Sequence, residues 1–189
     1  MEQRLREALS RRQKRYIIEA KLVPSAVLVP IYYKEGEYHI LFTKRTGWVK
    51  KHKGQISFPG GAQQEGDKTL IDTALRECAE EIGLAPGEVK PLGELDDTLT
   101  ETSNYVISPF VALIPYPYQF RVDGGEVEEI IEVPVSALLD EKCLRQVTAI
   151  IGGQAVASYF YNYQERLIWG ATARILHQFL DIFTRVMGD

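Results

Sequence analysis

The chain has 189 residues, of which 45% are apolar and 25% are charged. These fractions lie close to the average of soluble globular proteins, and they exclude a disordered, collagen-like or low-complexity chain. The length suits one core, and the net charge of −4 disfavours proteins that coat nucleic acids or membrane surfaces. We therefore expect residues 1–189 to form a single domain that binds no nucleic acid and no membrane.

Residues 1–20 are predicted to contain a surface helix that extends the domain at its N-terminus. Leu5 and Leu9 recur there among charged residues at helical spacing. The segment lacks the continuous apolar stretch of a secretory signal, and its acids argue against an organellar leader. We therefore expect a cytoplasmic location, in which the two cysteines, Cys78 and Cys143, are reduced and buried.

Two strands of a β-hairpin are predicted over residues 25–33 and 38–43, which are rich in β-branched and aromatic residues. The first of them is too short to cross a membrane as a helix, which takes about 20 residues. A third strand is predicted over residues 55–58. The Pro-Gly-Gly sequence at 59–61 is expected to end it, because proline lacks an amide donor and glycine adopts unusual dihedrals.

A helix is predicted next, starting at Asp67 or Thr69. Thr69 and Asp72 have the spacing of a capping box, in which each side chain accepts a hydrogen bond from the other residue's amide. Gly83 and Pro86 mark the end of the helix.

The second half of the chain is predicted to contain further strands, a short helical turn and a final helix with apolar residues every three or four positions. In chain order these are strands 105–115 and 129–133, the turn 134–139, strand 157–169 and helix 175–186. Strands outnumber helices and do not alternate with them regularly. This pattern indicates an α/β (α+β) fold, an α/β/α sandwich around a mixed β-sheet.

Glu77, Glu80 and Glu81 share one face of the predicted central helix. At 3.6 residues per turn, Glu80 lies about 60° to one side of Glu77 and Glu81 about 40° to the other. Arg76 precedes Glu80 by four positions, so an ion pair can orient that carboxylate. Carboxylates this close repel one another, and a divalent cation such as Mg²⁺ would relieve the repulsion. A solvated acidic helix face is the alternative interpretation.

Residues upstream of this helix provide the groups that an anionic substrate needs. Gly60 and Gly61 allow close approach, so that a backbone carbonyl could join a metal shell or an amide could contact a phosphate. Arg45 offers a planar guanidinium for phosphate contacts, and Lys50 offers a point charge. We therefore expect a metal held by carboxylates beside a phosphate-bearing substrate.

Residues 61–84, GAQQEGDKTLIDTALRECAEEIGL, resemble the Nudix box, the signature of a family that hydrolyses nucleoside diphosphates linked to another moiety. The second half of the box is intact and consists of Arg76, Glu77, Glu80, Glu81, Gly83 and Leu84. The first half departs from the pattern. The acid after Gly61 is Asp67 rather than glutamate, and one extra residue separates it from Arg76.

The resemblance implies a Nudix fold and the roles of the site residues. The implied ligands of Mg²⁺ or Mn²⁺ are the Gly61 carbonyl, Glu77, Glu80 and Glu81, and the implied catalytic residues are Arg76, Glu77, Glu80 and Glu81. One of these glutamates, or a carboxylate from elsewhere in the chain, would deprotonate the attacking water. The candidates from elsewhere are Glu126, Glu128 and Glu129.

Residues 41–61, LFTKRTGWVKKHKGQISFPGG, resemble the signature of the coenzyme A pyrophosphatase branch of Nudix enzymes. Thr46 stands where that pattern has serine or alanine, and Lys50 where it has arginine. The implied reaction cleaves coenzyme A or its derivatives to 3',5'-adenosine bisphosphate and 4'-phosphopantetheine. The implied substrate contacts are Arg45, Lys50 and Gly60.

Other interpretations remain open. The same chemistry could act on ADP-ribose, a dinucleotide or a nucleoside triphosphate, or a Nudix-fold module could bind a nucleotide without cleaving it. Trp48 and His52 either contact the substrate or belong to an ordinary surface loop, whereas Trp169 is expected in the core. The sequence leaves both a monomer and a homodimer open.

Overall fold

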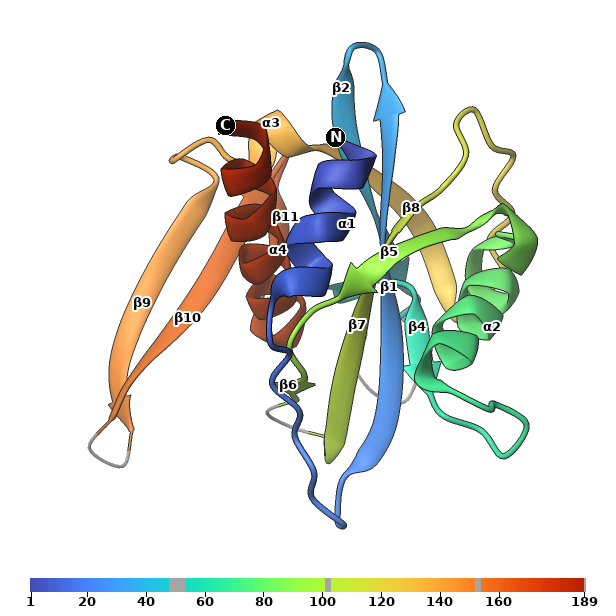
Figure 1. Ribbon diagram of the computed structural model, residues 1–189, viewed down its shortest axis with the longest axis horizontal. Coiled ribbons are helices and arrows are strands. Elements are labelled where there is room, and N and C mark those ends of the chain that lie inside the picture. The colour runs from blue at the N-terminus through green and yellow to red at the C-terminus, as the bar shows by residue number, and fades with distance from the viewer. Residues whose placement is uncertain (48–53, 101–102, 152–153, 189) are drawn as a thin grey trace.

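The computed structural model describes residues 1–47, 54–100, 103–151 and 154–188 (Figure 1). Its helices are α1 (Glu2–Arg11), α2 (Leu70–Ile82), α3 (Val135–Leu138) and α4 (Gly170–Gly188), with a 3₁₀ turn at Pro86–Glu88. Its strands are β1 (Val23–Lys34), β2 (Glu37–Arg45), β3 (Ile56–Ser57), β4 (Gly60–Ala62), β5 (Lys90–Glu94), β6 (Thr98–Leu99), β7 (Tyr105–Leu113), β8 (Val127–Pro134), β9 (Leu144–Ile151), β10 (Gln154–Tyr163) and β11 (Arg166–Ile168). Within the described residues, no helix is both long and apolar enough to span a membrane.

β1 lies at the centre of a mixed sheet whose main path has the order β3-β2-β1-β7-β5. β7 runs parallel to β1, and the other pairs in this sheet are antiparallel. β4 pairs with β1, so that Gly60 lies opposite Val27 and Gly61 opposite Ala26. This pairing brings the glycine pair to the middle of the molecule. β9, β10 and β11 form a separate sheet.

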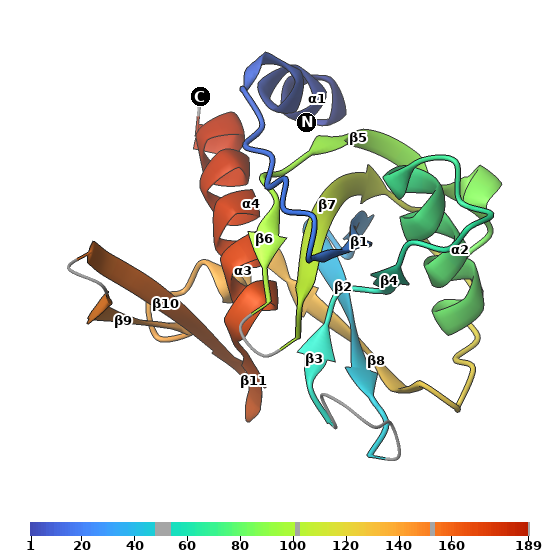
Figure 2. The same cartoon turned by 90° about the horizontal axis from the view of Figure 1, so that it is seen from below.

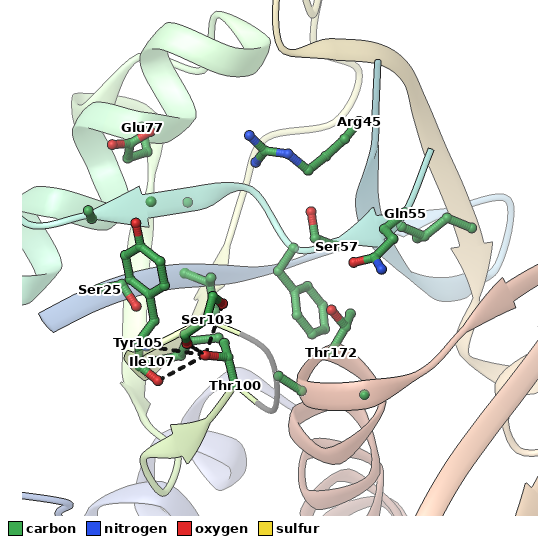
Figure 3. Close-up of a pocket in the computed structure, with 18 of the residues that line it drawn as sticks. Ser25, Arg45, Gln55, Ser57, Glu77, Thr100, Ser103, Tyr105, Ile107 and Thr172 are labelled. Carbon is green, nitrogen blue, oxygen red and sulfur yellow. Dashed lines mark hydrogen bonds between the residues drawn. The ribbon is translucent and has the colours of Figure 1, made fainter. Parts of the chain in front are cut away.

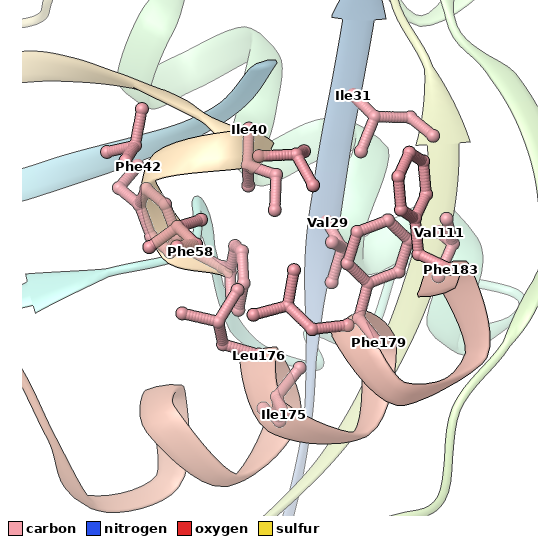
Figure 4. Packing of buried hydrophobic residues seen from close by; sticks show 14 of the residues in the cluster. Val29, Ile31, Ile40, Phe42, Phe58, Val111, Ile175, Leu176, Phe179 and Phe183 are labelled. Atoms are coloured by element: carbon pink, nitrogen blue, oxygen red, sulfur yellow. The ribbon is translucent and has the colours of Figure 1, made fainter. Parts of the chain in front are cut away.

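Helices cover both faces of the mixed sheet, which confirms the predicted α/β/α sandwich (Figures 1 and 2). Successive residues of β1 point to opposite faces. Leu28 packs into the core that α2 covers, whereas Val29 and Ile31 pack into the core that α1 and α4 cover. Phe179 and Phe183 of α4 fill this second core (Figure 4). The run of apolar residues in β1 is continuous because both faces of the strand are buried.

The N-terminal helix is shorter than predicted, and its apolar stripe is buried. α1 ends at Arg11, and residues 12–22 contain no helix. Leu5 and Leu9 are only 0% and 4% exposed, since they pack into the core beside α4. The other residues of α1 are exposed or partly exposed, so the prediction of a surface helix is confirmed. Gly93 of β5 permits this packing, because a Cβ atom there would lie 2.6 Å from the Cβ of Leu9.

The other differences concern strand ends. The predicted strand 157–169 is a hairpin of β10 and β11, whose turn holds Gln164 and Glu165 at φ angles of 49° and 64°. No glycine marks this turn, so the sequence pattern did not reveal it. The predicted strand 55–58 is β3, which ends before Pro59 as expected, and the glycines at 60 and 61 begin a further strand, β4. The strands β5, β6 and β9 were not predicted.

Candidate active site

α2 carries the acidic residues, and its ends are fixed as the sequence predicted. The capping box is present, with the Thr69 side chain accepting from the Asp72 amide at 3.3 Å and Asp72 accepting from the Thr69 amide at 2.9 Å. Gly83 closes the helix at a φ of 67°, and its amide donates to the Ala79 carbonyl at 3.2 Å. Because Cys78 of α2 is fully buried in the core, the acidic face turns toward β4 and solvent.

The three glutamates differ sharply in their surroundings. The Glu81 side chain is only 5% exposed and the Glu77 side chain 14%, whereas that of Glu80 is 57% exposed. Glu81 accepts a hydrogen bond from the Gly60 amide at 3.2 Å. Among the described residues, no group of three or more His, Cys, Asp or Glu side chains is placed to hold a metal ion. The shared helix face predicted from the sequence thus brings Glu77 and Glu81 close to β4 and leaves Glu80 at the edge.

Arg76 holds the acidic side chains in place. Its Nη1 atom lies 2.8 Å from Glu77 and 2.9 Å from Glu80, which confirms the predicted contact with Glu80. Its Nε and Nη2 atoms each lie 3.0 Å from an oxygen of Asp67, and Nη2 also donates to the Ala62 carbonyl at 3.1 Å. This bidentate contact holds the pKa of Asp67 well below its usual range. Asp67 therefore anchors Arg76, a role that the sequence did not predict.

Burial makes the two inner carboxylates difficult to ionise. It raises the pKa of Glu81 to about 8, against the opposing effects of the Gly60 amide and the Arg45 guanidinium. Burial also raises the pKa of Glu77, against the hydrogen bond from Arg76. The charge of Glu77 further raises the pKa of Glu81, and the charges of Glu80 and Glu126 further raise that of Glu77. Such strongly perturbed groups beside a cavity are typical of functional sites.

The backbone of β4 leaves no room for side chains beside these carboxylates. A Cβ atom on Gly61 would lie 2.5 Å from the carboxyl carbon of Glu77, and one on Gly60 would lie 2.2 Å from the Ala26 carbonyl oxygen. Carboxylates and a backbone carbonyl are the hard oxygen donors that Mg²⁺ and Mn²⁺ prefer. Glu77, Glu81 and the Gly61 backbone therefore form a donor set that fits such an ion.

Arg45, at the end of β2, connects α2 with a distant segment. Its Nη1 atom lies 3.8 Å from Glu81, and its Nη2 atom lies 3.0 Å from Glu126. Glu126 thereby joins the site. Glu128 lies 3.0 Å from Lys44, and Glu129 lies 2.6 Å from Arg166. Of these three candidate bases, only Glu126 is among the residues lining the cavity described next.

A cavity of about 650 Å³ opens between β4, the start of β7 and the start of α4 (Figure 3). Its lining includes Arg45, Gly60, Gly61 and Glu77, four residues that the sequence predicted to be in the site. Trp169 is 42% exposed and also lines the cavity, so the prediction of a core position was wrong. The predictions for Trp48, Lys50 and His52 lie outside the described residues.

Replacing Glu81 with glutamine is expected to make the metal-free protein less sensitive to rising pH. The pKa of Glu81 is about 8 in the folded protein and 4.5 as the reference value, so between these values the folded state alone retains the proton. The free energy of unfolding therefore falls as pH rises, by up to about 1.4 kcal/mol per pH unit for this one group.

Urea unfolding with a chelator at pH 5.5 and pH 8 measures this effect. Wild type and the exposed control Glu88→Gln should lose more stability over this range than Glu81→Gln, which lacks the titrating carboxyl group at position 81. An equal loss in all three proteins would contradict the assignment.

Comparisons with known proteins show the family of this chain. A family model for the NUDIX domain matches residues 22–149. A protein from Photorhabdus laumondii subsp. laumondii, named uncharacterized Nudix hydrolase NudL, is 39% identical over 154 residues that cover 82% of this chain and 81% of the relative. The protein of the same name from Yersinia enterocolitica is 34% identical over 154 residues, which cover 82% of this chain and 78% of that protein.

Solved structures share the fold. The MutT/nudix family protein from Enterococcus faecalis has a TM-score of 0.59 at 15% identity, and the match covers 92% of this chain and 65% of that one. The NUDIX domain of Shewanella oneidensis NrtR, complexed with ADP ribose, has a TM-score of 0.52 at 22% identity, covering 65% of this chain and 78% of that one. The family model and the relatives show that this chain belongs to the Nudix hydrolase family, whose enzymes cleave phosphorus anhydrides in nucleoside diphosphate derivatives.

Proposed function

We propose that this chain hydrolyses the diphosphate bond of coenzyme A or its derivatives, giving 3',5'-adenosine bisphosphate and (acyl-)4'-phosphopantetheine. The observation that carries the proposal is the cavity in which Glu77 and the glycines of β4 face Arg45. A diphosphate fits between a guanidinium and hard metal ligands. The choice of coenzyme A is supported by the resemblance of residues 41–61 to the coenzyme A pyrophosphatase signature.

We propose that the metal binds between α2 and β4. Nudix hydrolases use divalent metal ions, and the ligands proposed here are Glu77, Glu81, the Gly61 carbonyl and the exposed Glu80. When bound, Mg²⁺ or Mn²⁺ neutralises charge on the diphosphate oxygens and polarises water. The raised pKa values of Glu77 and Glu81 support this assignment, since a cation favours the ionised form of both groups.

The side chains around the metal ligands have separate tasks. Arg45 contacts a phosphate and offsets its charge, and Arg76 keeps Glu77 against β4. In the hydrolysis, the oxygen of water bonds to one phosphorus while the bridging oxygen leaves on the other phosphate. A carboxylate accepts the proton of the water. Within the described residues, the carboxylates near Arg45 are those of Glu77, Glu81 and Glu126, so we assign the base to this group.

The domain organisation, the location and the oligomeric state of the protein are also predictions. We infer that residues 1–189 form a single Nudix domain, because α1 and α4 contribute to the same core. A cytoplasmic location is inferred from the sequence. The sedimentation coefficient of the purified protein would distinguish a monomer from a homodimer.

A hydrolysis assay with several substrates tests the proposed function. We expect Mg²⁺- or Mn²⁺-dependent cleavage of coenzyme A into the two stated products, and no cleavage with a chelator, because the metal offsets diphosphate charge. ADP-ribose and dinucleoside polyphosphates are the comparison substrates. A preference for ADP-ribose would contradict the coenzyme A assignment, and nucleotide binding without cleavage of any substrate would favour a binding module.

Gly61→Ala is expected to weaken Mn²⁺ binding and turnover at least tenfold. The new methyl group would occupy the space of the Glu77 carboxylate, which must then move away from β4. Calorimetric Mn²⁺ titration and initial rates measure the effect. The matched control is Gly66→Ala, since a Cβ atom at Gly66 would have no neighbour within 4 Å. Equal Mn²⁺ affinity in both variants would remove Glu77 from the proposed metal site.

Glu81→Gln is expected to reduce turnover by at least two orders of magnitude while the fold is retained. The amide can still accept a hydrogen bond from Gly60, but it brings no negative charge to a cation. Initial rates measure the loss, and circular dichroism and thermal unfolding check the fold. The exposed variant Glu88→Gln serves as the control and should keep the wild-type rate. Near-normal rates in Glu81→Gln would exclude Glu81 from the reaction.

A further inference from the structure

The cavity has two chemically different ends (Figure 3). The charged side chains that line it within the described part of the chain are Arg45, Glu77 and Glu126, and they lie at one end. The opposite end, here called the hydroxyl end, is lined by Thr100, Ser103 and Thr172, and the Tyr105 side chain extends from this end toward β4 (Figure 3). This difference indicates that the two ends contact different parts of a substrate.

Part of the hydroxyl end is a fixed wall. The Ser103 hydroxyl donates to the Thr100 hydroxyl at 3.1 Å, and the Tyr105 amide donates to the same atom at 3.2 Å. Ser103 is buried, so water does not compete for its hydrogen bond to Thr100. These bonds engage the hydroxyls of Thr100 and Ser103. The Tyr105 side chain lies along the cavity, below β4 (Figure 3).

Two hydroxyls remain available for a ligand. Among the described residues, neither the Tyr105 hydroxyl nor the Thr172 hydroxyl makes a hydrogen bond within the protein, and both side chains line the cavity. The apolar side chains of Val27, Phe58 and Ile107 also line the cavity. Separate hydroxyls on an apolar wall suit a neutral chain that alternates amides with methylene groups.

A phosphate group would be poorly placed at this end. Burying a charged phosphate without a cationic partner costs far more free energy than burying a neutral amide that finds hydroxyl partners. Arg45, the cation that lines the described cavity, lies at the other end. The extra phosphate of a phosphoadenosine group is therefore expected on the Arg45 side.

We propose that the hydroxyl end binds the neutral pantetheine arm of the substrate through Tyr105 and Thr172, and that the phosphoadenosine half lies toward Arg45. This inference rests on the proposed coenzyme A hydrolase function and adds an orientation of the substrate within the cavity. It makes Tyr105 and Thr172 specificity-determining residues, distinct from the groups that hold the metal or the diphosphate.

Calorimetric binding of the two product halves tests the orientation without any turnover. The proteins are wild type, Thr172→Val, Tyr105→Phe and the control Thr184→Val, which changes an exposed threonine on the same helix. The first two variants should weaken binding of 4'-phosphopantetheine about fivefold each, the effect of one lost hydrogen bond. Their affinity for 3',5'-adenosine bisphosphate should stay within twofold of wild type, and the control should change neither affinity.

Three outcomes would overturn the orientation. These are weaker binding of the bisphosphate alone, equal weakening of both halves, and no change in either half. Thermal unfolding of each variant identifies a general loss of structure, and Tyr105→Phe and Thr172→Val change different walls, so one misfolded variant leaves the other as the test. A wild-type protein that binds both halves yet fails to cleave coenzyme A would refute the proposed function and leave the binding subsite supported.

Discussion

The burial of Glu77 and Glu81 against the glycine backbone of β4 is the interaction on which the site depends. Burial penalises both charges, and the fold offsets this with a backbone amide from Gly60 and with the guanidinium groups of Arg45 and Arg76. These contacts do not restore ordinary acidity, since the pKa of Glu81 stays near 8. In the proposed metal site, a divalent cation would complete the compensation, and stability without metal would then be given up for function.

Arg76 connects three segments of the site through its guanidinium group. Its guanidinium contacts Asp67 before α2, Glu77 within α2, and the Ala62 carbonyl in β4. One side chain therefore fixes the loop, the helix and the strand relative to one another. The departure from the Nudix box is absorbed in this loop, because the extra residue still lets the shorter acid Asp67 reach two guanidinium nitrogens.

Local patterns were sufficient to predict some parts of the molecule and insufficient for others. The capping box of α2, its terminal Gly83 and the pairing of Arg76 with Glu80 depend on neighbours within four residues, and all were predicted. Glu126 could not be chosen over Glu128 and Glu129, and Trp169 was misplaced, because both reach the cavity only through pairing of distant strands and packing of α4, which no spacing in the sequence encodes. The same reason explains where the two buried leucines of α1 pack, since the core that covers them comes from α4 and β5.

β1 pairs with β4 on one side and with β7 on the other, so that the cavity has two walls of different composition. Ser25 of β1 lies opposite Ala62 of β4 on one side and opposite Ile107 of β7 on the other. β4 and α2 present the acidic groups, whereas β7 and α4 present the hydroxyl end. Because β1 separates the two walls, a substitution on the wall formed by β7 and α4 can change which group is accepted while leaving the carboxylates of α2 in place. In the proposed function, substrate choice would in this way be physically separable from the diphosphate chemistry.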